Sequence, residues 1–172
     1  MKRILLSLML LIGCILTVAA GPLAVEEGSA AVLRENASAI FELDLDHCTF
    51  ERKEDFKAWC GNDYDVRVSL MEEFFPEYFN EYNKGLKITS DAGNAQYKMV
   101  LHVDQFIRKM GGCYGAKAFM RIYGDITVTD LKTNDTVCKI RISKLNGRQD
   151  FVETDRFPKV MRALAKKLAK LK

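Results

Sequence analysis

One glycine-rich run has the look of a phosphate-binding loop. It reads Gly-Gly-Cys-Tyr-Gly-Ala-Lys over residues 111–117. A phosphate-binding loop needs Gly-x-x-x-x-Gly-Lys followed by Ser or Thr, because backbone amides cradle the phosphates and the hydroxyl binds magnesium. Here the spacing is one residue short, no hydroxyl follows Lys117, and a strand pattern comes next. We therefore interpret residues 111–117 as a hairpin turn.

Metal-binding residue types gather at the end of one predicted strand, namely Asp44, Asp46, His47 and Cys48. Adjacent residues of a strand point to opposite faces of its sheet, so these four could reach one ion only across a bulge. His102 and Asp104 do share a strand face, and we interpret them as a solvated pair. The sequence also lacks a serine-centred nucleophile elbow. We therefore assign no catalytic residue, no metal and no cofactor.

Four cysteines follow residue 20, namely Cys48, Cys60, Cys113 and Cys138. In an oxidising compartment they could form up to two disulfide bonds, in three possible connectivities. A bond between Cys48 and Cys60 would close a loop of about 13 residues, worth about 3 kcal/mol by chain entropy, and this is the pair we favour. The alternative is that all four are thiols that behave as small hydrophobic side chains. We expect Cys138 in the core.

The amino terminus has the pattern of an export signal. Lys2 and Arg3 precede an apolar run over residues 4–20, which Gly21-Pro22 ends, and small residues precede a cut after Ala20. We predict a signal peptide over residues 1–20. One alternative is a retained anchor, since an apolar run of about 17 residues is at the lower limit for crossing a bilayer. The other is lipidation of Cys14, which ends a Leu-Ile-Gly-Cys sequence similar to the lipoprotein box of bacteria.

Composition is that of a folded chain with balanced charge. Of the 172 residues, 48% are hydrophobic and 28% are charged, with 11 Gly and 3 Pro, which excludes extensive disorder. Without residues 1–20 the length suits one domain. Loss of Lys2 and Arg3 takes two of the 26 basic residues and leaves the rest almost matched by 23 acidic ones. The charge therefore gives no case for a nucleic-acid partner.

Periodicity in the first half predicts a tether, a strand and a helix. Residues 21–38 are small, polar and weakly periodic, and we predict a flexible tether there. Apolar and acidic residues alternate around Ile40, which predicts a half-buried strand. Aromatic residues recur at three- and four-residue steps over residues 65–82, which predicts an amphipathic helix that Pro76 kinks or divides. We interpret its aromatic stripe as core; the alternative is a hydrophobic ligand groove.

Alternation in the second half predicts three strands, which begin near Tyr97, Ala116 and Cys138. A final helix over residues 156–171 has an apolar stripe and, opposite it, a basic face that includes Arg162, Lys166, Lys167 and Lys170. Such a face could bind an anionic membrane or a partner. We favour packing of the stripe on the sheet, with the cations in water near the carboxyl end of the helix.

The element order is therefore strand, helix, three strands, helix. Each element has one apolar face to bury, which predicts an α+β two-layer sandwich of a three-strand antiparallel meander, an amino-terminal strand and two helices on one face. A right-handed crossover through the first helix would place the amino-terminal strand parallel to its neighbour. We predict one domain over residues 39–172.

The carboxyl-terminal half carries a family resemblance. Three sequence features carry it. The first is the strand Tyr-Lys-Met-Val-Leu-His-Val over residues 97–103, and the second is the strand over residues 124–133, which ends in Asp-x-x-Thr where a turn begins. The third is the terminal helix, which is rich in Ala, Leu and Lys. In these patterns the chain resembles bacterial envelope proteins related to the curli-secretion channel lipoprotein and the amino-terminal domain of TolB. The resemblance implies a periplasmic, non-enzymatic role in assembly, transport or scaffolding, frequently through oligomers.

We therefore expect a non-enzymatic cell-envelope protein that acts by macromolecular binding, as an assembly, transport-accessory or scaffolding subunit. Its location would be the periplasm, the periplasmic face of the outer membrane, or the medium after secretion. Its partners would be proteins, including copies of itself, with membrane association through the amino terminus. The alternative is a secreted small-ligand or inhibitor module of cystatin-like shape, although the Gln-x-Val-x-Gly hairpin of that group is missing.

Overall fold

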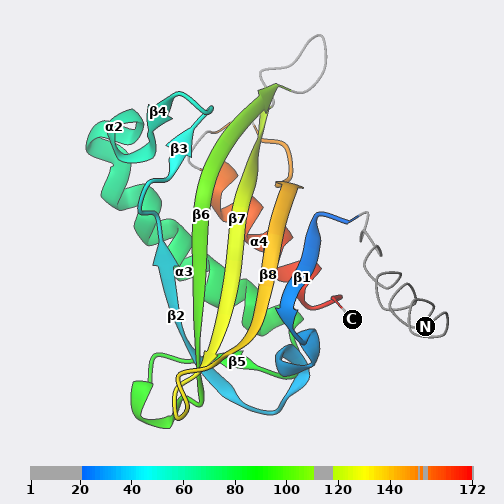
Figure 1. Ribbon diagram of the computed structural model, residues 1–172. Helices are drawn as coiled ribbons and strands as arrows, with labels where there is room; N and C mark the ends of the chain where they lie inside the picture. Colours follow the sequence, from blue (N-terminus) through cyan, green and yellow to red (C-terminus); the bar gives the residue numbers. More distant parts are fainter. Residues whose placement is uncertain (1–20, 111–117, 151, 153–154, 172) are drawn as a thin grey trace, which may run out of the picture.

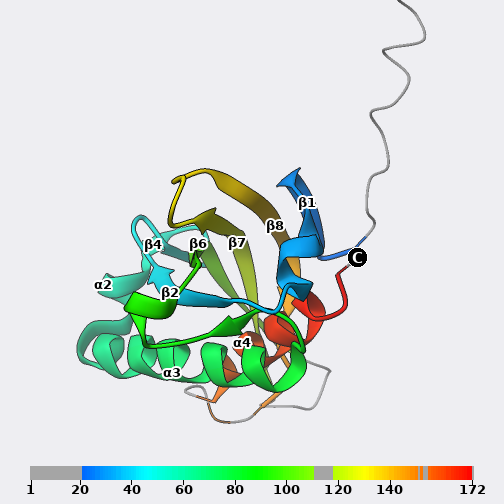
Figure 2. The ribbon, with the colours of Figure 1, turned by 90° about the horizontal axis from the view of Figure 1, so that it is seen from below.

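The computed structural model describes residues 21–110, 118–150, 152 and 155–171. The predicted signal peptide over residues 1–20, with Cys14, lies outside the described residues, and so does Cys113. The described chain forms one sheet, and the helices α3 (Tyr64–Tyr82) and α4 (Arg156–Leu168) cover one of its faces, as Figure 2 shows. This is the α+β two-layer arrangement that the sequence predicts.

The long strands of the sheet follow one another in sequence. β6 (Tyr97–Met110), β7 (Ala118–Asp130) and β8 (Thr136–Asn146) form the predicted antiparallel meander. β2 (Ser38–Asp44) lies parallel to β6, the pairing expected for strands joined through a helix. The short β5 (Lys87–Ile88) extends the sheet beyond β2, and the turn η3 (Ala92–Asn94) leads into β6. The strand order is β1-β8-β7-β6-β2-β5 (Figure 1).

The segment before β2 is not the flexible tether expected over residues 21–38. β1 (Leu23–Gly28) pairs antiparallel with β8, so the first described strand joins the last one. The 3-10 helix η1 (Ala30–Arg34) then buries Val32 and Leu33. Of the six residues of β1 only Leu23 is buried, so this edge strand lacks the alternation that identifies a strand. The domain therefore begins at β1 rather than at residue 39.

A small subdomain between β2 and α3 closes one end of the core. It consists of β3 (Thr49–Phe50), β4 (Glu54–Asp55), α2 (Phe56–Cys60) and the turn η2 (Gly61–Asp63), and β3 pairs with β6 beyond the end of β2. Aromatic rings fill the interior: the Phe56 ring lies 5.0 Å from Phe106 and 5.7 Å from Phe157. No sequence pattern predicted these short elements.

Helix α3 is one continuous helix with Pro76 inside it. Of the two expected effects of Pro76, a kink or a division of the helix, the division is therefore wrong. The carbonyl that loses its donor is that of Glu72, which is exposed, so water can satisfy it. On the opposite side Met71, Phe75 and Phe79 follow at four-residue steps and are completely buried. Of the predicted aromatic stripe, Phe75 and Phe79 therefore lie in the core, as favoured, whereas Phe74, Tyr78 and Tyr82 are half-buried. Tyr82 lines an open groove on the surface.

Helix α4 packs its apolar stripe beneath the meander and beside α3. The buried residues are Phe157, Val160, Met161, Leu164, Ala165 and Leu168. This confirms the packing that we favour for the final helix. Among the described residues, the buried core cluster extends from Leu23 to Leu168.

Candidate functional site

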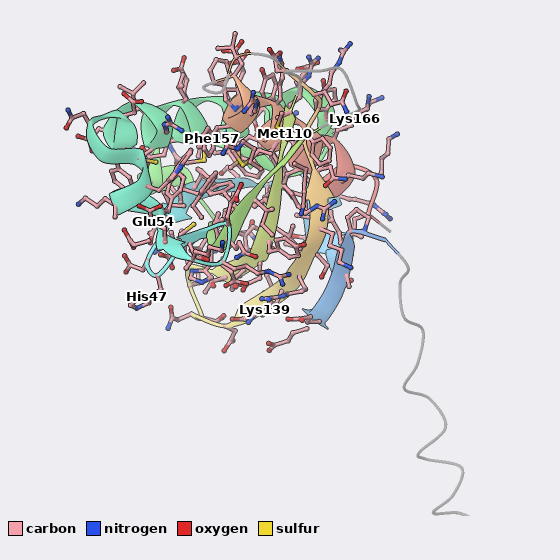
Figure 3. All side chains as sticks on the ribbon, turned by 90° about the horizontal axis from the view of Figure 1, so that it is seen from above. His47, Glu54, Met110, Lys139, Phe157 and Lys166 are labelled. Carbon is pink, nitrogen blue, oxygen red and sulfur yellow. The ribbon has the colours of Figure 1, made fainter. Side chains whose placement is uncertain are left out.

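The face of the sheet that the helices leave uncovered carries paired charges, and we call it the open face. Along β6 the residues alternate between the core and this face. Lys98 on β6 has its Nζ 2.6 Å from Oε2 of Glu42 on β2. Figure 3 shows Lys139 of β8 on the open face and Lys166 of α4 on the other side of the sheet. A solvated polar face is ordinary in antiparallel sheets, so a site must be argued from its geometry.

His102 lies in the middle of the open face, between two aspartates. Its Nδ1 is 2.8 Å from Oδ2 of Asp44 on β2, and its Nε2 is 3.2 Å from Oδ1 of Asp104. Asp104 is the extra residue of a β-bulge, at which the register with β7 shifts. Gly124 lies opposite the bulge, where a Cβ atom would stand 2.1 Å from the carbonyl oxygen of His102. The close approach of the two strands at the site therefore requires glycine.

Arg141 extends these pairs along the open face to β8. Its guanidinium nitrogens lie 2.9 Å from Oδ2 of Asp104 and 3.6 Å from Oδ2 of Asp125 on β7. The side chain of Asp125 is only 13% exposed. Four neighbouring strands thus hold one connected series of charges, which we call the ion-pair network: Asp44, His102, Asp104, Arg141 and Asp125.

The network sets the charge of its histidine. Burial alone lowers the pKa of His102, but the hydrogen bond with Asp44 and the charges of Asp44, Asp104 and Asp125 outweigh it and raise that pKa. Burial raises the pKa of Asp44, but hydrogen bonds from the Asp46 amide and from His102 outweigh it and lower that pKa. An imidazolium with a carboxylate at each nitrogen is therefore favoured. Both nitrogens then donate, and no lone pair remains to accept a proton. The network suits recognition through fixed charges better than proton transfer.

The predicted basic face contains cations of two kinds. Arg162 donates from Nε to the hydroxyl of Tyr82 at 2.7 Å, and Lys166 lies over the same ring at 5.9 Å from its centroid. Lys167 and Lys170 are exposed and form no ion pair with any described residue. Two of the four predicted cations are thus attached to α3 through Tyr82, and two are free to meet a partner.

The bond expected between Cys48 and Cys60 is not formed. Both residues are buried, in the subdomain whose interior the aromatic rings fill. Burial, followed by the nearby Asp55 and Cys60, raises the pKa of Cys48 far above its usual value. Such a thiol is hardly ionised and packs as a small hydrophobic side chain. Cys138 is buried in β8, as predicted.

The metal-binding residue types at the end of β2 and directly after it do not converge on one point. Asp44 accepts a hydrogen bond from the backbone amide of Asp46 at 2.9 Å. His47 has a positive φ of 63° and lies at the surface, as Figure 3 shows, whereas Cys48 is buried. In the described ranges, no group of three or more His, Cys, Asp or Glu side chains is arranged to hold a metal ion. None of the described helices is both long and apolar enough to cross a membrane.

Sequence reasoning missed a buried arginine at the aromatic end of the core. Arg67 of α3 is 7% exposed, and its guanidinium carbon lies 4.5 Å from the ring centroid of Trp59. It pairs with Asp63 at 3.2 Å, while its Nε and NH1 atoms have no hydrogen-bond partner. Its spacing is the signal that could have identified it, because Arg67 continues the four-residue series of Met71 and Phe75. The members of the ion-pair network, in contrast, meet only through strand register.

These elements define the class of the molecule as a two-layer α+β domain with one charged sheet face open to solvent. No known family model and no curated protein matches the sequence. Among solved structures, the PelC dodecamer from Paraburkholderia phytofirmans is similar over 88% of this chain and 99% of its own, with a TM-score of 0.50 and 14% identity. A DUF330 protein from Xanthomonas campestris is similar over 82% and 86%, with a TM-score of 0.44 and 10% identity. A minor lipoprotein from Acinetobacter baumannii is similar over 80% and 90%, with a TM-score of 0.36 and 12% identity.

The likeness to the PelC structure shows a shared fold. None of these three structures is the curli-secretion channel lipoprotein or TolB, so the particular resemblance drawn from residues 95–172 stays a prediction.

Proposed function

We propose that this chain is an exported cell-envelope subunit that acts by binding macromolecules, including copies of itself, through the open face. The observation that carries the proposal is the ion-pair network, which runs from Asp44 on β2 to Arg141 on β8. The sheet holds these charges in place before a partner arrives, so less side-chain entropy is lost on binding. Fixed charges of both signs also determine which partner fits and in which orientation.

Self-association through this face has a simple geometric basis. A surface with acids and bases side by side is complementary to a second copy turned by a half rotation, so that Asp104 of one copy meets Arg141 of the other. The PelC structure that shares the fold is a dodecamer, which supports self-association without giving the number of subunits here.

The edge of the sheet formed by β1 is a weaker candidate for self-association. β1 is short, its register shifts between Val25 and Glu27, and Glu26 and Glu27 are exposed along it. A bulge and charges are the features that protect an edge strand from pairing with another chain. The face of the sheet is therefore the surface we assign to self-association.

Export is supported by the sequence of residues 1–20, in which two basic residues precede an unbroken apolar run. The proposed location is the periplasm, the periplasmic face of the outer membrane, or the medium. Expression of the full chain in a bacterium, followed by fractionation and mass spectrometry, tests this. A mature protein that begins near Gly21 or at an acylated Cys14 supports export, and an intact chain in the cytosol contradicts it.

Light scattering coupled to size exclusion, on the detergent-solubilised full chain, tests self-association. We expect a mass above that of the monomer for the natural sequence and a shift to monomer for Arg141→Glu, because the reversed charge meets Asp104 and Asp125. Lys132→Glu changes the net charge equally in an exposed turn, and it should leave the mass unchanged. A natural chain that is monomeric at high concentration, or an Arg141→Glu variant that keeps its mass, would count against the open face.

A further inference from the structure

The point at which residues 1–20 join the domain lies beside the basic face of α4. Gly21 and Pro22 line one open groove, of about 600 Å³, together with Lys144 of β8 and Lys167 of α4. Figures 1 and 2 both show the carboxyl end of α4 close to β1, the strand that residues 1–22 precede. The apolar amino-terminal segment is therefore attached next to lysines from two different elements.

A second groove continues this surface across α4. It shares Ala163 with the first groove and is lined by Arg148 and Lys166. We call the exposed cations of the two grooves and the adjoining helix end the basic edge: Lys144, Arg148, Lys166, Lys167 and Lys170.

The basic edge has few acids to neutralise it. No ion pair joins its members to a residue of the described chain, and residues 156–172 contain no Asp or Glu. The acids of β1, Glu26 and Glu27, lie toward the far end of that strand, where Glu27 pairs with Lys139 in register. The basic edge thus has a local positive charge within a chain that is almost neutral.

The two helices give the domain opposite charges on its two sides. α4 contacts β7 and β8, whereas α3 contacts β2 and β5. The exposed residues of α3 include Glu72, Glu73 and Glu77. An anionic surface would attract the α4 side and repel the outer side of α3, and this gives the domain a preferred orientation.

We propose that the basic edge docks the domain on an anionic phospholipid surface. This surface would be that of the membrane toward which the apolar amino-terminal segment directs the chain. The proposal rests on the proposed export to the cell envelope. The segment outside the described structure has 20 residues, none acidic, and its apolar run ends at Ala20, directly before Gly21. Because the domain starts at β1, there is no long tether, and an anchored chain would hold the basic edge close to the head groups. Attraction of Lys and Arg to such a surface falls off within a Debye length, about 8 Å at physiological salt.

Co-sedimentation with vesicles tests the docking directly. Residues 21–172 contain every member of the described core cluster and lack the apolar segment, so binding must come from the domain itself. We expect binding to vesicles of phosphatidylethanolamine and phosphatidylglycerol at 3:1, loss of binding at high salt, and no binding to phosphatidylcholine vesicles. The variant Lys144→Gln/Lys167→Gln/Lys170→Gln should bind about 100-fold more weakly, since each of the three lysines contributes about a factor of five near the surface.

The matched control is Lys53→Gln/Lys57→Gln/Lys132→Gln, which removes three exposed charges away from the basic edge. Circular dichroism establishes that both variants fold. Equal losses in the two variants, equal binding to neutral vesicles, or no binding to anionic vesicles would overturn the proposal. If the true partner of the basic edge were an acidic protein, the domain would not bind to anionic vesicles. None of these results bears on self-association through the open face, which light scattering tests separately.

Discussion

Replacement of Phe157 by alanine is expected to destabilise the whole domain, because this ring connects three parts of the core. Phe157 stands in the first turn of α4 and is completely buried. Its ring lies 5.2 Å from Phe106 of β6 and 5.7 Å from Phe56 of α2. The guanidinium carbon of Arg67 on α3 is 5.5 Å from the same ring. The helix layer, the sheet and the small subdomain thus meet at one side chain.

The expected loss is about 3–5 kcal/mol, the range for a buried Phe→Ala change that leaves a cavity. Aromatic pairs contribute about 0.5–1.5 kcal/mol beyond the buried area, and Phe157 makes several, so the upper half of that range applies. Domains have about 5–15 kcal/mol in total. With a urea dependence of about 2 kcal/mol per molar, the unfolding midpoint should fall by about 2 M.

Urea unfolding can be followed through Trp59, the one tryptophan of the chain, whose ring lies 6.4 Å from Phe157. Circular dichroism of the same samples reports on the whole fold. The control is Phe74→Ala: Phe74 is half-buried and stacks on Tyr78 at 5.7 Å, so a loss of about 1 kcal/mol is expected. If Phe157→Ala cost no more than Phe74→Ala, the joint packing of α4, β6 and α2 around this ring would be wrong.

Three further predictions concern the network and the core. The pKa of His102 is raised in the fold, so its stabilising contribution is complete below the unfolded value of about 6.5 and is lost as pH rises through the folded pKa. His102→Gln should therefore lower the free energy of unfolding in urea more at pH 5.5 than at pH 9. Equal losses at the two pH values would contradict the network. Cys48 is buried and its pKa is raised, so iodoacetamide should modify it at least about tenfold more slowly in the native protein than in urea. Peptide mass spectrometry measures the two rates. Similar rates would show that the thiol is accessible. Gly124→Ala would place a Cβ atom 2.1 Å from a backbone oxygen and should lower the melting temperature by about 4 °C or more. Gly93→Ala, whose Cβ atom would stand 3.4 Å from its nearest neighbour, a side-chain oxygen of Asp91, should have little effect, and equal shifts would contradict the bulge.

The long elements could be predicted from sequence because their signal is local and repeated. Met71, Phe75 and Phe79 recur along one helix face, and the alternation of β6, β7 and β8 continues for many residues. β1 could not be predicted, because an edge strand that buries one residue has no such signal. Its place in the sheet is determined by the backbone of β8, far along the chain.

The candidate site was predicted in part for a related reason. His102 and Asp104 stand two positions apart, so their common face follows from the period of a strand. Asp44 and Arg141 approach them only through pairing in register, and Asp104 reaches Arg141 at a bulge that sequence does not reveal. The raised pKa of His102 depends on those non-local neighbours, which is why the pair was interpreted as merely solvated.

The pairing of β1 with β8 has a consequence for how the chain matures. Leu23 must find Ile142. In the export that we propose, β1 would cross the membrane first and would have no partner until almost all of the polypeptide had followed. Contacts so distant in sequence form slowly, because a large loop must close before they contribute. The pairing of β1 with β8 can therefore form only after almost the whole chain has been synthesised. Until then, β1 would be an accessible extended segment for a holdase chaperone.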